Sequence, residues 1–142
     1  MKHYFALICV SVVLGMFVGC ENDKLPKTVP AEGVVTLDGA TVSDATVLLI
    51  ADVGDINASA VSDKNGKFLL NAFPEKSGAV PGSYKVSISK TINEAASEKK
   101  GETMVNLKYG LPQKYSLYTT SGLTYTLGEK GDKNIKFDLQ SK

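Results

Sequence analysis

The sequence contains no arginine and no tryptophan, and its only cysteines and histidine lie within the first twenty residues. From Glu21 onward the chain therefore cannot form a disulfide, a Cys/His zinc site, a cysteine nucleophile or a histidine general base. All 16 basic residues are lysines, and they offset 15 acidic residues to a net charge of +1. We therefore expect no nucleic-acid partner, no metal, no cofactor and no catalytic residue.

The first twenty residues have the pattern of an export signal. A short basic start is followed by an apolar run from Tyr4 to Val18 and then by Gly19 and Cys20. The run is too short for a comfortable transmembrane helix, which needs about 20 residues. The pattern predicts a signal peptide over residues 1–19. Polar residues 20–30 then predict a short tether.

The end of this segment resembles the lipobox of bacterial lipoproteins. In that pattern an apolar residue, a small residue and Gly or Ala precede an invariant Cys; Val18, Gly19 and Cys20 match, and Phe17 stands where Leu is usual. The resemblance implies cleavage before Cys20 and a diacylglycerol on its sulfur, hence a protein of the bacterial cell envelope held to a membrane. An ordinary signal peptide or an uncleaved anchor is the alternative.

Residues 31–142 have the pattern of a single all-β domain. Short segments alternate between apolar and polar residues and are separated by Gly, Pro, Asn and Asp. About seven strands are expected, over residues 33–37, 45–51, 58–62, 67–73, 84–89, 123–127 and 135–139. Strands of this length and spacing predict an antiparallel β-sandwich. Residues 90–120 interrupt the rhythm: we expect an exposed insertion over 90–103, with one or two helical turns, and an irregular stretch over 104–120.

Two turns organise this prediction. Asn65 and Gly66 tolerate the positive φ of a tight hairpin, so residues 67–73 are expected to pair back on residues 58–62. Gly128 and Gly131 predict a second hairpin that joins the last two strands. Alternation also predicts which side chains are buried. We expect these to point inward: Val35, Leu37, Val47, Leu49, Phe68, Leu70, Tyr84, Val86, Ile88, Leu123, Tyr125, Ile135, Phe137 and Leu139. We expect these to point outward: Lys67, Lys85, Ser87, Thr124, Lys136 and Asp138.

Four motifs in order resemble the carboxypeptidase regulatory-like domain. They are Gly33-Val34-Val35-Thr36-Leu37-Asp38-Gly39, Asp44-Ala45-Thr46-Val47, Ser62-Asp63-Lys64-Asn65-Gly66-Lys67-Phe68 and Pro81-Gly82-Ser83-Tyr84-Lys85-Val86. The tail, Leu111–Tyr115 with Thr120–Thr124, resembles the closing part of small bacterial lipoproteins built on this domain. The resemblance implies a transthyretin-like, immunoglobulin-like sandwich that acts as an accessory module and has no catalytic residues.

Two acidic stretches are candidate metal sites with simpler explanations. Asp63-Lys64-Asn65-Gly66 is similar to the start of a calcium loop, but position twelve holds Pro74 where an EF-hand has Glu, so a hairpin turn is expected. Asp52, Asp55 and Asn57 share one loop, for which we expect a solvated surface.

Tyr109, Tyr115 and Tyr118 are the candidate ligand-binding residues, because tyrosine rings suit sugar stacking and protein interfaces. Alternatively, they pin an irregular segment to the sandwich. The functional expectation is a non-catalytic envelope lipoprotein with a structural or protein-interaction module, whose partner is an unknown envelope protein or glycan. A carbohydrate- or other ligand-binding module of starch-binding-like sandwich type is the alternative, and a cluster of exposed tyrosines on one face would favour it.

Overall fold

A computed structural model of the protein describes residues 25–93 and 107–142. The predicted signal peptide, the candidate lipidation residue Cys20 and most of the expected insertion lie outside the described residues. The regular elements of the described chain are β-strands, apart from one short 3-10 helix, η1 (Gln113–Ser116). The strands are β1 (Ala31–Leu37), β2 (Ala40–Thr41), β3 (Thr46–Ala51), β4 (Ala58–Val61), β5 (Lys67–Leu69), β6 (Asn71–Phe73), β7 (Lys76–Ser77), β8 (Gly82–Ser89), β9 (Thr91–Asn93), β10 (Leu107–Tyr109), β11 (Leu123–Leu127) and β12 (Asp132–Leu139).

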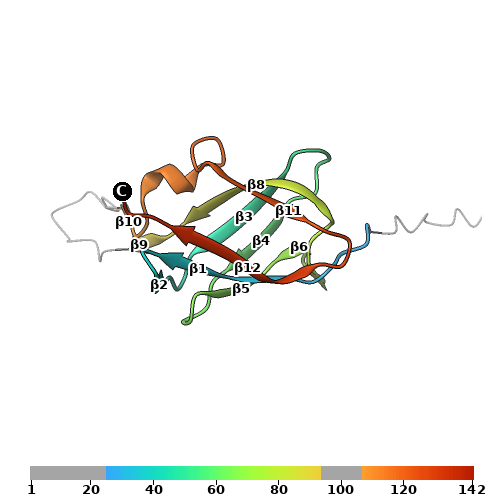
Figure 1. Ribbon diagram of the computed structural model, residues 1–142, viewed down its shortest axis with the longest axis horizontal. Coiled ribbons are helices and arrows are strands. Elements are labelled where there is room, and N and C mark those ends of the chain that lie inside the picture. The colour runs from blue at the N-terminus through green and yellow to red at the C-terminus, as the bar shows by residue number, and fades with distance from the viewer. Residues whose placement is uncertain (1–24, 94–106) are drawn as a thin grey trace, which may run out of the picture.

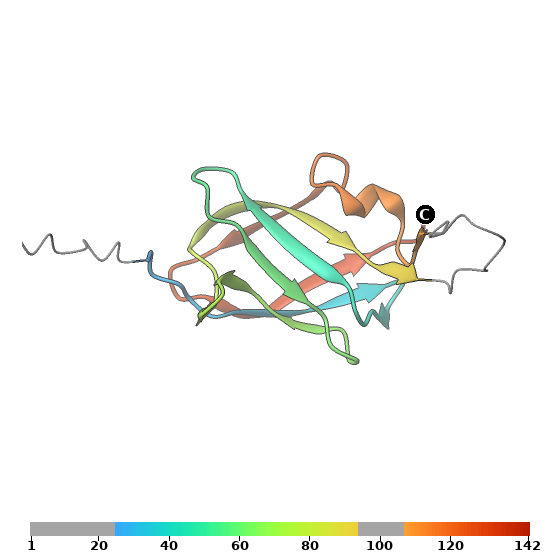
Figure 2. The ribbon, with the colours of Figure 1, turned by 180° about the vertical axis from the view of Figure 1, so that it is seen from behind.

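Two sheets pack face to face and form an all-β sandwich, which confirms the predicted fold class (Figures 1 and 2). The smaller sheet has the order β12-β1-β2, and β5 also pairs with β1. The larger sheet has the order β11-β8-β3-β4-β6-β7. Strands β9 and β10 form a separate two-stranded ribbon.

The last two strands do not form the predicted hairpin. β11 pairs antiparallel with β8 in the larger sheet, whereas β12 pairs with β1 in the smaller one. The β1–β12 ladder is parallel, so the first and last long strands of the domain lie side by side. The turn at Gly131 thus carries the chain from one sheet to the other.

The segment after Gly66 also divides between the sheets. β5 pairs with β1 in the smaller sheet, and only β6 returns to β4, through the pair Ser59 and Asn71. The prediction that all of residues 67–73 pairs back on residues 58–62 is therefore wrong for β5. The crossing residue is Leu70, whose side chain is fully buried and whose N–H donates to the carbonyl of Ala31 at 2.9 Å. Burying Leu70 between the sheets fixes where the chain changes sheet.

The alternation of buried and exposed side chains largely follows the prediction. Eleven of the residues expected to point inward are buried, and Leu37, Leu123 and Tyr125 are partly buried against the same core. The prediction is wrong for Ser87, which is expected to point outward but has an exposed fraction of only 7%. It is a small side chain on an interior strand, opposite Leu48, so larger neighbours cover it. Alternation gives the face on which a residue lies but not how far its neighbours shield it.

The ordered domain begins before Ala31. Val29 is buried in the core and pairs with Ala79 through two backbone hydrogen bonds of 2.9 and 3.0 Å. The Thr28 hydroxyl donates to the carbonyl of Ser77, and the Lys76 ammonium donates to the carbonyl of Pro26. The part of the expected tether that is described, from Pro26 onward, is therefore fastened along the β6–β7 side of the sandwich.

The expected insertion over 90–103 and the irregular stretch over 104–120 both contain short regular elements in their described parts. Thr91–Asn93 is strand rather than the start of a helical turn, and it pairs with Leu107–Tyr109. Beyond the ribbon, η1 contacts β8, and Leu111 and Tyr115 are buried in the core. This segment thus closes one end of the sandwich, the end at which the C-terminus also lies (Figure 1).

Candidate functional site

The three candidate tyrosines do not share one environment. Tyr115 is buried, and its hydroxyl donates to the carbonyl of Gln140 at 3.3 Å and accepts from the Gln140 N–H at 3.0 Å. The Lys114 ammonium lies 4.8 Å from the centre of the Tyr115 ring. Tyr115 therefore joins η1 to the chain after β12, and its ring is not open to a ligand.

Tyr109 and Tyr118 are exposed, at 49% and 43% of their surface. Tyr109 ends β10, and Tyr118 follows η1 in the loop that leads to β11. With Tyr115 inside the core, the three residues do not form the stacking platform that a sugar ring would need.

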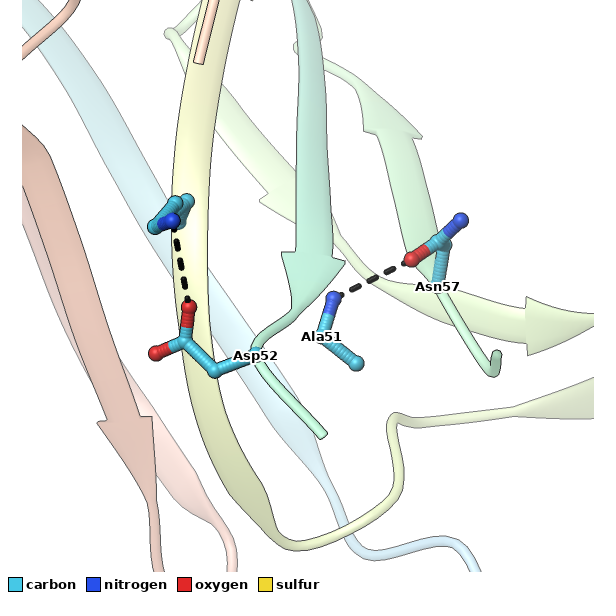
Figure 3. Close-up of polar contacts among 4 residues, drawn as sticks. Ala51, Asp52 and Asn57 are labelled. Atoms are coloured by element: carbon cyan, nitrogen blue, oxygen red, sulfur yellow. Dashed lines mark hydrogen bonds and ion pairs between the residues drawn. The ribbon is translucent and has the colours of Figure 1, made fainter. Parts of the chain in front are cut away.

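The polar groups of the acidic loop after β3 contact other groups of the protein (Figure 3). The Asn57 side-chain oxygen accepts a hydrogen bond from the Ala51 N–H at 3.1 Å, and Asp52 lies 3.9 Å from the ammonium group of Lys85. Among residues 25–93 and 107–142, no group of three or more acidic, His or Cys side chains is arranged to hold a metal ion. The geometry therefore fits a surface loop.

The Asp63 side chain likewise makes hydrogen bonds within its own turn. One of its carboxylate oxygens accepts hydrogen bonds from the N–H groups of Asn65 and Lys67, at 2.8 and 2.9 Å. The Gly66 N–H donates to the Asp63 carbonyl, and Gly66 has φ of +75°. The positive φ predicted for Asn65-Gly66 is confirmed at Gly66, whereas Asn65 has no positive φ. The turn is one residue longer than a two-residue hairpin, with glycine in the left-handed position.

A groove of about 290 Å³ lies on the smaller sheet, where β5, β1 and β12 run side by side. Gly33 is one of the residues that line it, and a Cβ atom there would lie 2.3 Å from the Ile135 carbonyl oxygen and 2.6 Å from the Phe68 ring. Only glycine allows the strands and the Phe68 ring to approach so closely. No local sequence pattern indicates this groove, because its walls come from three segments far apart in the chain.

Lysines line both sides of the groove. Val34 is paired with Lys67 on one neighbouring strand and with Lys136 on the other. With strands about 4.8 Å apart, these two lysines start roughly 10 Å from each other across Val34. Lys133 is the third lysine of the groove, and Glu32 is its single acidic residue.

A β-bulge in β12 brings Lys133 to this position. Ala31 is aligned with Asp132, and Gly33 with Ile135, so β12 has one more residue than β1 between these points. Lys133 and Asn134 are consequently both exposed, although strict alternation would place one of them inward. Bulges often redirect side chains in this way at functional surfaces.

Comparisons with protein-family models, with curated proteins and with solved structures found no match for this chain. The resemblance to the carboxypeptidase regulatory-like domain thus stays a prediction. Within the part of the chain that the structure describes, no helix is long and apolar enough to cross a membrane.

Proposed function

We propose that the protein is a lipid-anchored, non-catalytic component of a bacterial cell envelope, whose β-sandwich serves structure or contact with an envelope protein. The observation that carries the proposal is the order along the chain of an apolar leader, the pair Gly19-Cys20, a short polar stretch and a sandwich whose core begins at Val29. Nine residues reach at most about 30 Å, so an acyl chain on Cys20 would hold the sandwich beside the membrane.

We base the proposed lack of catalytic function on the residue types present from Glu21 onward. From Glu21 onward an active site would have to use carboxylates, Lys, Tyr and Ser alone, since His, Cys and Arg are missing. Tyr115, Ser62 and Ser121 are committed to structural hydrogen bonds. We propose further that the sandwich is an accessory module related to the carboxypeptidase regulatory-like domain, which the order of its four motifs supports.

The anchor is tested by metabolic labelling with a fatty-acid analogue in cells that express the full chain. The wild-type protein should carry the label and Cys20→Ser should not. Cys9→Ser is the matched control, since Cys9 lies in the leader and should leave with it, so this variant should be labelled normally. Label on the Cys20→Ser protein, or none on the wild type, would refute the lipid anchor.

The carbohydrate-binding alternative has less support from the tyrosines. Tyr115 is inside the core, and only Tyr109 and Tyr118 are exposed for stacking. Glycan binding would therefore require a surface other than one formed by these three tyrosines.

A further inference from the structure

The groove on the smaller sheet concentrates positive charge in a protein whose net charge is close to zero. Lys67, Lys133 and Lys136 line it together with a single carboxylate, that of Glu32, whereas the whole chain has a net charge of +1. Three cations in one groove repel one another, so their convergence favours binding of an anion.

No described carboxylate lies within 4.0 Å of the ammonium groups of these lysines. The one ion pair within 4.0 Å between described side chains joins Lys85 to Asp52, on the larger sheet. The three ammonium groups of the groove are therefore free of acidic partners among residues 25–93 and 107–142. Each is carried by a long flexible side chain that can meet a ligand from a different side.

The groove lies at the point where the chain enters the sandwich. Pro30 accepts a hydrogen bond from the N–H of Asp132 at 2.8 Å, and Glu32 in the groove wall is two positions further on. The described chain begins at this end of the molecule, and the C-terminus lies at the opposite end (Figures 1 and 2). The groove is thus close to the segment that leads back to Cys20.

An apolar side chain accompanies the lysines. Leu69 follows Lys67 by two residues in β5, on the same outward face, and 45% of its surface is exposed. In the sheet it is paired with Glu32. Leu69 thus lies beside the groove, and lysines combined with an exposed leucine also occur on amphipathic helices that bind at the boundary between lipid headgroups and acyl chains.

We propose that this groove binds the phosphate groups of anionic phospholipids in the membrane that holds the Cys20 anchor. The inference rests on the proposed function, because the anchor would keep the groove close to the lipid surface and raise the local concentration of headgroups. Lys67 and Lys136 approach the phosphate across Val34, and Lys133 adds a third contact from the bulge. The sandwich then lies with its smaller sheet toward the bilayer.

Vesicle binding tests the inference without the acyl chain. The chain Glu21–Lys142 retains every described residue, and the whole core and both sheets lie within it. Its co-sedimentation is measured with vesicles of phosphatidylglycerol and phosphatidylcholine and with vesicles of phosphatidylcholine alone, at low and at physiological salt. We expect binding to the anionic vesicles only, and weaker binding as salt increases.

Two variants of equal charge locate the site. The groove variant changes Lys67, Lys133 and Lys136 to Gln, and the control variant changes Lys85, Lys114 and Lys142 to Gln, away from the groove. At about fivefold per lysine near an anionic surface, the groove variant should bind on the order of a hundredfold more weakly at low salt. The control should lose far less. Glu32→Gln removes the one opposing charge and should bind several-fold more tightly.

Three outcomes would overturn the inference. These are no binding of the wild-type chain to anionic vesicles, equal losses in the groove and control variants, and displacement from vesicles by inorganic phosphate or polyglutamate at concentrations comparable to that of the lipid phosphate. The last result would make the groove a general anion site. Because the chain tested lacks the acyl group, failure here leaves the anchor itself untouched, and failure of fatty-acid labelling leaves the groove's lipid affinity untouched.

Discussion

The hydroxyl of Tyr125 donates a hydrogen bond to a carboxylate oxygen of Asp132 at 2.6 Å, and this bond joins β11 of the larger sheet to β12 of the smaller one. The second oxygen of the same carboxylate accepts from the Asn134 N–H at 2.7 Å, within the bulge. The hydrogen bond from Tyr125 holds the pKa of Asp132 below its usual value. Partial burial, together with the Asp132 carboxylate, raises the pKa of Tyr125.

Tyr125→Phe should lower stability and change its dependence on pH. The pKa of Asp132 is lower in the folded state than in the unfolded state. Asp132 therefore stabilises the fold at pH values above its unfolded pKa of about 4, and this stabilisation is lost as the pH falls through the folded pKa. The pKa of Tyr125 is raised in the folded state. Its contribution to stability is therefore fully present below the unfolded pKa of about 10, and it is lost as the pH rises from that value through the folded pKa. Urea unfolding of the wild type and of Tyr125→Phe from pH 3 to pH 11 measures both. Parallel stability curves for the two proteins would contradict this coupling.

Phe137→Ala should be one of the most costly substitutions in the last strand. The Phe137 ring is stacked on Phe68, with centroids 5.7 Å apart, and meets Tyr125 edge to face at 6.1 Å. Removing a buried Phe costs about 3–5 kcal/mol, a large part of the 5–15 kcal/mol expected for a whole domain. Lys136→Ala is the matched control on the outward face, and it should change stability by less than about 0.5 kcal/mol. Similar midpoints for the two variants in urea would mean that β12 is placed in the wrong register.

Gly66→Ala should destabilise more than Gly54→Ala, although both glycines have positive φ, of +75° and +88°. The backbone penalty for alanine in this conformation is about 1–2 kcal/mol at either position. At Gly66 the new Cβ would also lie 2.8 Å from the Val35 carbonyl oxygen, whereas at Gly54 it would meet nothing within 4 Å. Relieving that contact should add about 1–3 kcal/mol. Equal midpoints of the two alanine variants in urea would show that Gly66 does not dock against β1.

Much of the local structure follows from the sequence by itself. Successive side chains of a strand point to opposite faces, so the alternation of apolar and polar residues indicates which face of each strand is buried. Val35, Leu49, Ile88 and Phe137 are inside for this reason, and Gly66 has the positive φ that its turn predicts. Ser87 departs from this pattern, because its burial depends on the size of the side chains beside it.

Which strands pair with one another is a property of the whole folded domain and not of any local segment. An apolar face is equally satisfied in either sheet, so alternation did not reveal that β5 leaves β4 for β1, or that β11 and β12 separate and β12 lies parallel to β1. The same long-range pairing buries Tyr115 and leaves Tyr118 exposed, although the two are three residues apart. It also places Lys67 and Lys136 on either side of Val34, although the three residues are far apart in the sequence. Strand pairing depends on hydrogen bonds between distant segments, and these are fixed by the packing of the whole core.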